Sequence, residues 1–152
     1  MMKKVIFDFV IYTDGACLGN PGPGGWGAII ISKNYSKKII QGGTKNTTNN
    51  RMELMAVIEA LDEIKENCKI KIFTDSKYVI NGIESWIENW KKNNWVTSNK
   101  KKVKNVDLWT KLDNVRVGKI ISWEWVKGHS GIKLNEEVDI LAKKQAMSLD
   151  VL

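Results

Sequence analysis

The sequence predicts an α/β domain with a mixed sheet, and two observations support this prediction. Apolar runs rich in β-branched and aromatic residues indicate five strands, in the order three strands, helix, strand, helices, strand, helix. Short polar connections favour an antiparallel meander for the first three strands, whereas helical crossovers favour parallel pairing for the last two. The 152 residues contain no internal repeat or linker, so we expect one domain over residues 1–152.

The first strand is expected over residues 5–12. It ends close to an acid, Asp14, and the glycine- and proline-rich segment that follows predicts a turn. Ligands of open α/β sheets bind beyond the ends of such strands, so Asp14 is the first candidate for a functional site. The alternative is that Asp14 only begins the turn, because Asp is a common turn residue.

Two further strands and a helix complete the first half of the chain. The strands are expected at residues 26–32 and 37–42. The polar segment 47–50 then offers several helix-capping side chains. Apolar residues follow at the spacing of one helical face, namely Leu54, Val57, Ile58, Leu61 and Ile64. They predict an amphipathic helix that ends near residues 67–68.

The second half alternates strands and helices. A fourth strand is expected at residues 69–74, directly before Asp75, and a fifth at residues 120–126. If the fourth strand lies parallel to the first, Asp14 and Asp75 leave the same sheet edge side by side. Helices are expected within residues 76–92, at 106–114 and at 135–147, the last capped by Asn135.

Four carboxylates lie near the ends of predicted elements: Asp14, Glu53, Asp75 and Asp139. Each alone could serve only to cap a helix or to complement its positive N-terminal end. The predicted topology brings all four to one sheet edge, where like charges repel unless a cation offsets them. Oxygen ligands without a histidine or cysteine group favour hard ions such as Mg²⁺. Two such ions suit phosphodiester hydrolysis, because they can stabilise both the attacking and the leaving oxygen.

The only histidine, His129, lies in a glycine-containing loop after the fifth predicted strand. A lone histidine is more often structural than catalytic, but a buried one would fit poorly between glycines. In a flexible loop, a side chain that titrates near neutral pH can carry protons or help a product leave. We therefore expect His129 to assist catalysis.

A basic segment and a net charge of +7 indicate an anionic partner, with nucleic acid as the first candidate. Residues 86–104 carry six lysines and three tryptophans against one acid. Tryptophans alone would indicate a core and lysines alone a solvated face, whereas the combination is typical of a nucleic-acid grip. Lysine contacts to phosphate predict binding that tolerates any sequence and weakens with salt. The polar segment 47–50 likewise suits phosphate or sugar contacts, with helix capping as the alternative.

The two cysteines, Cys17 and Cys68, are too few for a disulfide framework and lack metal-ligand spacing. The apolar N-terminal stretch is interrupted by Asp8, and no small-residue cleavage site follows it. No apolar run approaches the length needed to span a membrane. We expect a cytoplasmic protein without membrane contact.

Five ordered motifs, spread over residues 5–147, resemble bacterial ribonuclease HI, of the type 1 ribonuclease H family. The motifs are Thr13-Asp14-Gly15 with Cys17-Leu18-Gly19-Asn20-Pro21-Gly22, Thr48-Asn49-Asn50-Arg51-Met52-Glu53-Leu54, Thr74-Asp75-Ser76, Trp86 with Trp90-Lys91-Lys92, and Val126-Lys127-Gly128-His129 with Asn135-Glu136 and Asp139.

The resemblance implies a ribonuclease H-like fold: a five-stranded mixed sheet with the antiparallel meander at one edge and helices on both faces. It implies a cytoplasmic endonuclease that cuts the RNA strand of RNA–DNA hybrids with two Mg²⁺ ions, or Mn²⁺ in their place, and leaves 5′-phosphate and 3′-hydroxyl ends. By the same resemblance, the four acids bind the metal ions, Asp14 bridges them, and His129 assists proton transfer or product release.

The resemblance also implies substrate contacts. Cys17, Asn20, Asn49 and Asn50 match positions that contact the hybrid's minor groove and the ribose 2′-hydroxyls, by which a protein distinguishes RNA from DNA. Thr48 resembles the threonine of a phosphate pocket. The basic protrusion that holds the DNA strand is matched by Trp86, Trp90, Lys91, Lys92 and Trp95.

Some positions depart from the family pattern. Lys77 stands where a glutamine that touches RNA is expected, Asn46 replaces a basic residue beside the phosphate pocket, and Asn93-Asn94 replace a more cationic pair in the protrusion. These changes bear on affinity and on the optimum salt concentration. None of them removes an expected metal ligand.

Three other functions stay open at this point. A transposase or junction resolvase shares clustered acids, but the basic segment and the Thr-Asn-Asn loop are not expected there. A non-catalytic hybrid-binding module is expected to have lost at least one of the four acids. A detached reverse transcriptase domain is a third alternative, although the start and end of the chain favour a free-standing protein. We expect a monomer without an obligate protein partner.

Overall fold

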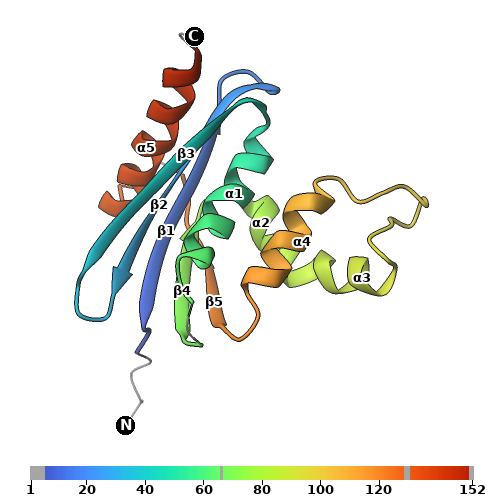
Figure 1. Cartoon of the computed structure of the whole chain (residues 1–152), viewed down its shortest axis with the longest axis horizontal. Coiled ribbons are helices and arrows are strands. Elements are labelled where there is room, and N and C mark those ends of the chain that lie inside the picture. Colours follow the sequence, from blue (N-terminus) through green and yellow to red (C-terminus); the bar gives the residue numbers. More distant parts are fainter. Residues whose placement is uncertain (1–5, 66, 129–130, 151–152) are drawn as a thin grey trace.

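Five strands form one mixed sheet in the order β3-β2-β1-β4-β5 (Figure 1). The structure, a computed structural model of the chain, describes residues 6–65, 67–128 and 131–150. The strands are β1 (Phe9–Cys17), β2 (Gly22–Ser32), β3 (Lys37–Thr47), β4 (Lys69–Thr74) and β5 (Ile120–Trp125). β1 pairs antiparallel with β2 and parallel with β4, and β4 pairs parallel with β5. The predicted mixed sheet is therefore confirmed.

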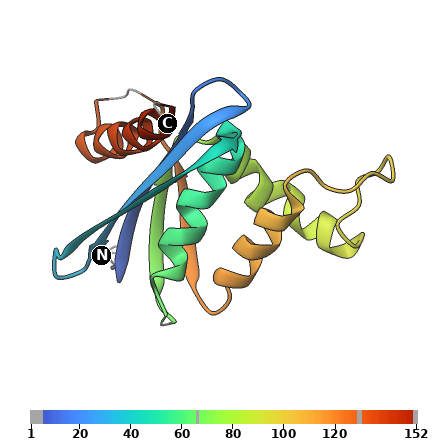
Figure 2. The same ribbon diagram turned by 45° about the horizontal axis from the view of Figure 1, so that its top comes forward.

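Helices cover both faces of this sheet, as the family resemblance implied. α5 (Lys133–Asp150) packs on β2, β1 and β3 from one side, and α1 (Asn49–Asp62) packs on β1 and β2 from the other (Figures 1 and 2). The remaining helical elements are α2 (Lys77–Asn81), the π-helical turn η1 (Gly82–Trp86), α3 (Ile87–Lys92) and α4 (Val106–Val115). Figure 2 shows α3 and the loop after it projecting away from the sheet.

The main core lies between α1 and the sheet. All five apolar residues that predicted this helix are buried, and Leu54, Val57 and Leu61 are fully inaccessible to solvent. They pack in one cluster with Ile11 of β1 and Ile72 of β4. Because this packing fixes α1 against β1 and β4, the N-terminal turn of the helix has a fixed position at the sheet edge.

The predicted turn after Asp14 is shorter than the glycine-rich segment and comprises residues 18–21. The glycines at 22–25 form the beginning of β2, and β1 continues through Asp14, which pairs with Gly27. The reason is the close approach of α5: a Cβ at Gly25 would lie 2.3 Å from the carbonyl oxygen of Ala142, so only glycine lets this helix lie on the strand. The alternative that Asp14 only begins a turn is therefore wrong.

Other boundaries also differ from the sequence prediction: β1 begins only at Phe9, and α1 ends at Asp62, before the expected residues 67–68. β3 extends to Thr47, where it pairs with Gly22 at the end of the hairpin. α5 begins at Lys133, and Asn135 is a buried residue of its first turn and not the cap. In the described part of the chain, no helix combines the length and the apolar character that crossing a membrane requires.

Candidate active site

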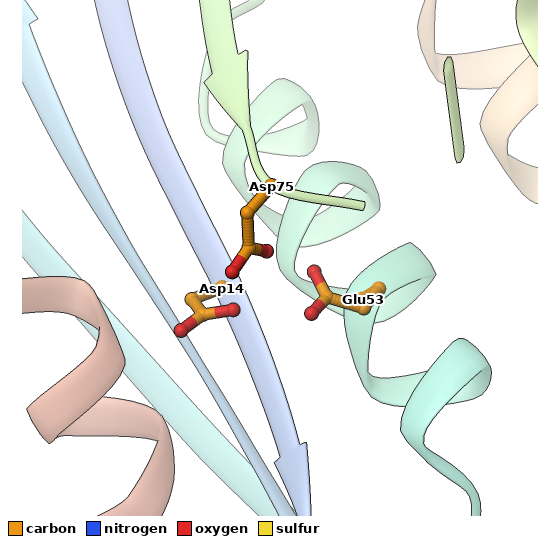
Figure 3. A group of neighbouring side chains, drawn as sticks. All are labelled: Asp14, Glu53 and Asp75. Carbon is orange, nitrogen blue, oxygen red and sulfur yellow. The ribbon is translucent and has the colours of Figure 1, made fainter. Parts of the chain in front are cut away.

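Three carboxylates meet at the edge of the sheet between β1 and β4 (Figure 3). Asp14 belongs to β1, Asp75 follows β4, and Glu53 lies near the N-terminal end of α1, directly after its first turn. One carboxylate oxygen of each residue lies within 4.8 Å of those of the other two. Figure 3 shows the three side chains pointing toward one another from these separate elements.

The strand register places the two aspartates side by side. β1 and β4 run parallel, and their last pair is Thr13 with Thr74. Asp14 and Asp75 are the residues that directly follow this pair. Asp14 remains paired with β2 on its other side, which keeps its backbone rigid. The predicted meeting of these two acids at one sheet edge agrees with the structure.

Glu53 reaches the same point because the start of α1 is fixed. The hydroxyl of Thr48 accepts a hydrogen bond from the backbone N–H of Arg51 at 3.3 Å and caps the helix. Arg51 in turn donates two hydrogen bonds to Asp107 of α4, at 3.0 and 2.7 Å. Thr48 is thus the helix cap that the sequence predicted among several candidates, and Arg51 ties the first turn to α4.

Burial makes the charge of this group unfavourable without a cation. Asp14 is 3% exposed, and burial followed by the charge of Asp75 raises its pKa to about 8. Burial also raises the pKa of Glu53 well above its ordinary value, helped by the charges of Asp14 and Asp75. The Oε2 atom of Glu53 is buried and has no hydrogen-bond partner among the described residues. A buried carboxylate oxygen without a donor fits a cation ligand, and an all-oxygen donor set fits Mg²⁺.

Asp139 approaches this group from α5 on the other face of the sheet. Its contact with Asp14 contributes to the raised pKa of Asp14, after burial and the charge of Asp75. Lys143, one helical turn further on, lies 3.0 Å from its Oδ2 atom. Asp139 does not belong to the group of carboxylates within 4.8 Å of one another in the described chain. The structure therefore gathers three of the four predicted acids closely and places the fourth beside Asp14.

His129 lies outside the described residues, so its predicted role stays a prediction. The preceding residue, Gly128, is close to the site: a Cβ there would lie 3.2 Å from the Oδ2 atom of Asp75. The loop that leads to His129 therefore starts beside an acid of the site.

The residues predicted to contact the minor groove cluster at the beginning of α1. The backbone N–H of Asn49 donates to the side-chain oxygen of Asn20 at 3.0 Å. The Cys17 thiol lies near the carbonyl oxygens of Gly22 and Thr47, at 3.4 and 3.3 Å. Asn20, Asn49 and Asn50 are exposed. The hairpin after β1 and the start of α1 thus form one polar surface.

The predicted basic segment has an aromatic base. Trp90 neighbours Trp86 and Trp95, with ring centroids 5.7 and 6.4 Å away, and forms an edge-type contact with the buried Trp109 at a centroid distance of 5.4 Å. The two predicted lysines differ. Lys91 forms ion pairs with Asp113 and Glu88, at 3.3 and 3.9 Å, whereas Lys92 is exposed and makes no ion pair within the described ranges. Lys92 is therefore the more available cation.

Three contacts at the site were missed by the sequence prediction. Lys143 could have been found, because it follows Asp139 at the i+4 spacing of a helical ion pair. The contact of Arg51 with Asp107 joins residues far apart in the sequence. The indole N–H of Trp125 donates to the backbone carbonyl of Asp75 at 3.0 Å, again across two elements. The last two contacts join distant segments, so no spacing pattern in the sequence predicts them.

Comparison with known proteins identifies the family. Residues 7–147 match the family model described as RNase H. The curated protein named Ribonuclease H from Pseudoalteromonas atlantica is 57% identical over 143 residues, which are 93% of this chain and 92% of that protein. The one from Wolbachia pipientis is 57% identical over 144 residues, 95% of this chain and 97% of its own length.

Solved structures agree with this result. The crystal structure of LC9-RNase H1, a type 1 RNase H with the type 2 active-site motif, superposes with a TM-score of 0.83 at 28% identity and covers 97% of this chain and 76% of that one. LC11-RNase H1 in complex with RNA/DNA hybrid gives a TM-score of 0.71 at 19% identity, covering 92% and 97%, which supports the fold alone. The chain therefore belongs to the RNase H family of enzymes.

Proposed function

We propose that this ribonuclease H enzyme hydrolyses the RNA strand of RNA–DNA hybrids with two Mg²⁺ ions and leaves 5′-phosphate and 3′-hydroxyl ends. The observation that carries the proposal is the group Asp14, Glu53 and Asp75, with a carboxylate oxygen of each within 4.8 Å of the others. Because two of these acids are buried and their pKa values are raised, the group favours a bound cation. When bound, two such ions would activate the attacking water and stabilise the leaving oxygen.

The residues of the site would divide this work. Asp14 interacts with both Asp75 and Asp139, which supports its proposed role as the ligand shared by two ions. Glu53 offers the buried Oε2 atom that lacks a donor in the described residues. His129 would take or deliver a proton at the sheet edge, because its loop begins beside Asp75. Mn²⁺ has the same preference for oxygen ligands and is the expected substitute.

Two surfaces would hold the hybrid. The exposed amides of Asn20, Asn49 and Asn50, together with Cys17, would contact the minor groove and the ribose hydroxyls. Thr48 already caps α1 through its hydroxyl, so its proposed phosphate contact would use the same helix N-terminus. The DNA strand would lie against the basic segment, whose proposed contacts are Trp86, Trp90, Lys91, Lys92 and Trp95.

Several accompanying proposals concern the state of the protein. We expect a cytoplasmic monomer with no membrane contact and no obligate protein partner. Light scattering of the purified protein measures whether it is a monomer. A mass of one chain at working concentration supports the monomer, and a mass of two chains contradicts it.

The proposed reaction is tested with one end-labelled RNA, annealed either to complementary DNA or to complementary RNA, with and without Mg²⁺. We expect cleavage of the DNA-paired RNA alone, only with Mg²⁺, and fragments that carry 5′-phosphate and 3′-hydroxyl ends. Tight binding of the hybrid without cleavage under Mg²⁺ or Mn²⁺ would instead indicate a non-catalytic hybrid-binding module. Equal cleavage of both duplexes would contradict the proposed substrate.

A further inference from the structure

Trp125 is an exposed aromatic residue next to the candidate active site. It is the last residue of β5, an edge strand of the sheet, and 42% of it remains accessible to solvent. An exposed tryptophan gains little from apolar burial at such a position. Its indole N–H, however, donates a hydrogen bond to the backbone carbonyl oxygen of Asp75 at 3.0 Å.

Asp75 occupies a place where the strand ladder ends. Thr74 is the last residue of β4 that pairs with β5, and its carbonyl oxygen accepts from the backbone N–H of Val126 at 2.9 Å. Asp75 follows as the chain turns into α2. The indole of Trp125 therefore extends the hydrogen bonding between β4 and β5 by one residue, to the acid of the site.

Two other hydrogen bonds of this turn come from its own segment. The backbone N–H of Ser76 donates to the hydroxyl of Thr74 at 3.1 Å, and the hydroxyl of Ser76 accepts from the N–H of Val79 at 3.2 Å. These two contacts shape the turn locally. The contact with Trp125 joins the turn to a neighbouring strand.

The same indole ring also holds the residue on the far side of the turn. The ammonium group of Lys77 lies 4.8 Å from the centroid of the Trp125 ring, within the range of a cation–π interaction. Lys77 is the first residue of α2. One side chain thus contacts both Asp75 and Lys77, on either side of Ser76.

The position of Asp75 matters because its neighbours repel it. Its carboxylate lies against those of Asp14 and Glu53, which are held by β1 and by α1. Asp75 is carried on a turn and is less buried than either of them. Because a turn is less constrained than a paired strand or a packed helix, it is the part of the site that like-charge repulsion would displace most easily.

We propose that Trp125 is a positioning residue that holds Asp75 toward Asp14 and Glu53 through the hydrogen bond to its carbonyl oxygen. The inference rests on the proposed function, because it takes Asp75 as a ligand of Mg²⁺. Residues that orient metal ligands without touching the metal typically change metal affinity or activity by about 10- to 100-fold when they are replaced.

The test compares Trp125→Phe with the wild type by titrating Mg²⁺ calorimetrically into the protein without substrate. The phenylalanine ring still faces Lys77 but has no N–H to donate. We expect about tenfold weaker Mg²⁺ affinity. In cleavage assays below saturating Mg²⁺ we expect a lower kcat with an unchanged KM for the hybrid. Trp123→Phe, two residues earlier on β5, is the matched control and should keep the wild-type Mg²⁺ affinity.

Circular dichroism establishes that each variant is folded, and Trp125→Met replaces Trp125→Phe if the latter is not. Unchanged Mg²⁺ affinity in the Trp125 variant would overturn the inference. So would an equal loss in Trp123→Phe, because the effect would then belong to the strand as a whole. A wild-type protein that binds no Mg²⁺ would contradict the proposed metal site itself, a result distinct from the other two.

Discussion

The backbone of Gly15 lies directly against that of Glu53. A Cβ on Gly15 would be 2.4 Å from the backbone nitrogen of Glu53, a distance that no real side chain tolerates. The residue next to Asp14 thus lets α1 approach β1 closely enough for Glu53 to reach the same site. The distance between Asp14 and Glu53 therefore depends on residue 15 being a glycine, which has no side chain.

Gly15→Ala should therefore disturb both stability and activity. The added methyl group would push α1 away from β1, at a cost of about 1–3 kcal/mol in the free energy of unfolding. A displacement of Glu53 by up to about 1 Å should lower kcat by about 100-fold. Urea unfolding and cleavage rates at saturating Mg²⁺ measure the two effects. A folded variant with the wild-type kcat would show that this close contact does not set the site.

The stability of the metal-free protein should depend on the ionisation of Asp14. Its pKa of about 8 in the folded protein lies above the ordinary value of 3.8, so the folded state binds this proton more tightly than the unfolded state does. The free energy of unfolding should therefore fall as the pH rises from about 4 to about 8. Asp14→Asn should flatten this dependence and stabilise the protein at pH 8, on the order of 1–3 kcal/mol.

Urea unfolding in the presence of a chelator, repeated across this pH range, tests that expectation. Asp8→Asn is the control, since the backbone N–H of Lys69 lowers the pKa of that carboxyl. Its replacement should leave the fall between pH 4 and 8 in place. A wild-type stability that rises steadily from pH 4 to 8 would contradict the buried, raised pKa of Asp14.

Much of the fold could be predicted because its signals are local. The spacing of Leu54, Val57 and Leu61 identified α1, and their burial follows from that pattern. The order of strands and helices fixed the parallel pairing of β1 with β4, which brings Asp14 and Asp75 together. These inferences needed only periodicity and connection rules.

The remainder depends on contacts between distant segments. Glycines weaken a strand signal, so Gly25 and its neighbours predicted a turn, although α5 requires their small size in β2. The hydrogen bond from Trp125 to Asp75 depends on the register of β4 with β5. The pairing of Lys91 with Asp113 likewise depends on how α3 packs beside α4. None of these contacts can be predicted from the sequence of either segment alone.

The link between Asn20 and the start of α1 should affect substrate binding more than catalysis. Asn20→Ala removes the acceptor of the Asn49 N–H and one exposed amide of the proposed minor-groove surface. We expect KM for the hybrid to rise about five- to tenfold with kcat changed less than twofold, since one hydrogen bond contributes about 0.5–1.5 kcal/mol. Steady-state kinetics measures this change. Asn34→Ala, in the turn before β3, is the control and should keep the wild-type KM.

The two lysines at the end of α3 should contribute unequally to hybrid binding. Lys92 makes no ion pair in the part of the chain that the structure describes, whereas Lys91 is paired with Asp113 and Glu88. Lys92→Ala should therefore reduce the slope of log Kd against log salt concentration by about 0.7–0.9, the value of one phosphate contact, and Lys91→Ala by less.

Fluorescence anisotropy with a labelled hybrid in Ca²⁺ buffer, over a range of salt concentrations, gives these slopes. Lys65→Ala, beyond the far end of α1, is the control lysine and should leave the slope unchanged. Slopes that stay the same in Lys92→Ala and in the double variant of Lys91 and Lys92 would mean that α3 does not meet phosphate.

The most direct test of the proposed acid-bound metal site measures hybrid binding and hybrid cleavage in the same samples of wild type, Asp14→Asn and Glu53→Gln. Both variants remove charge from the buried group while keeping its shape. The proposal predicts that each loses cleavage by at least about 1000-fold in Mg²⁺, and that each still binds the hybrid as tightly as the wild type or more tightly, because repulsion of phosphate is relieved. Retained turnover in Asp14→Asn would contradict it, since the acid at the centre of the site would then have no part in the reaction.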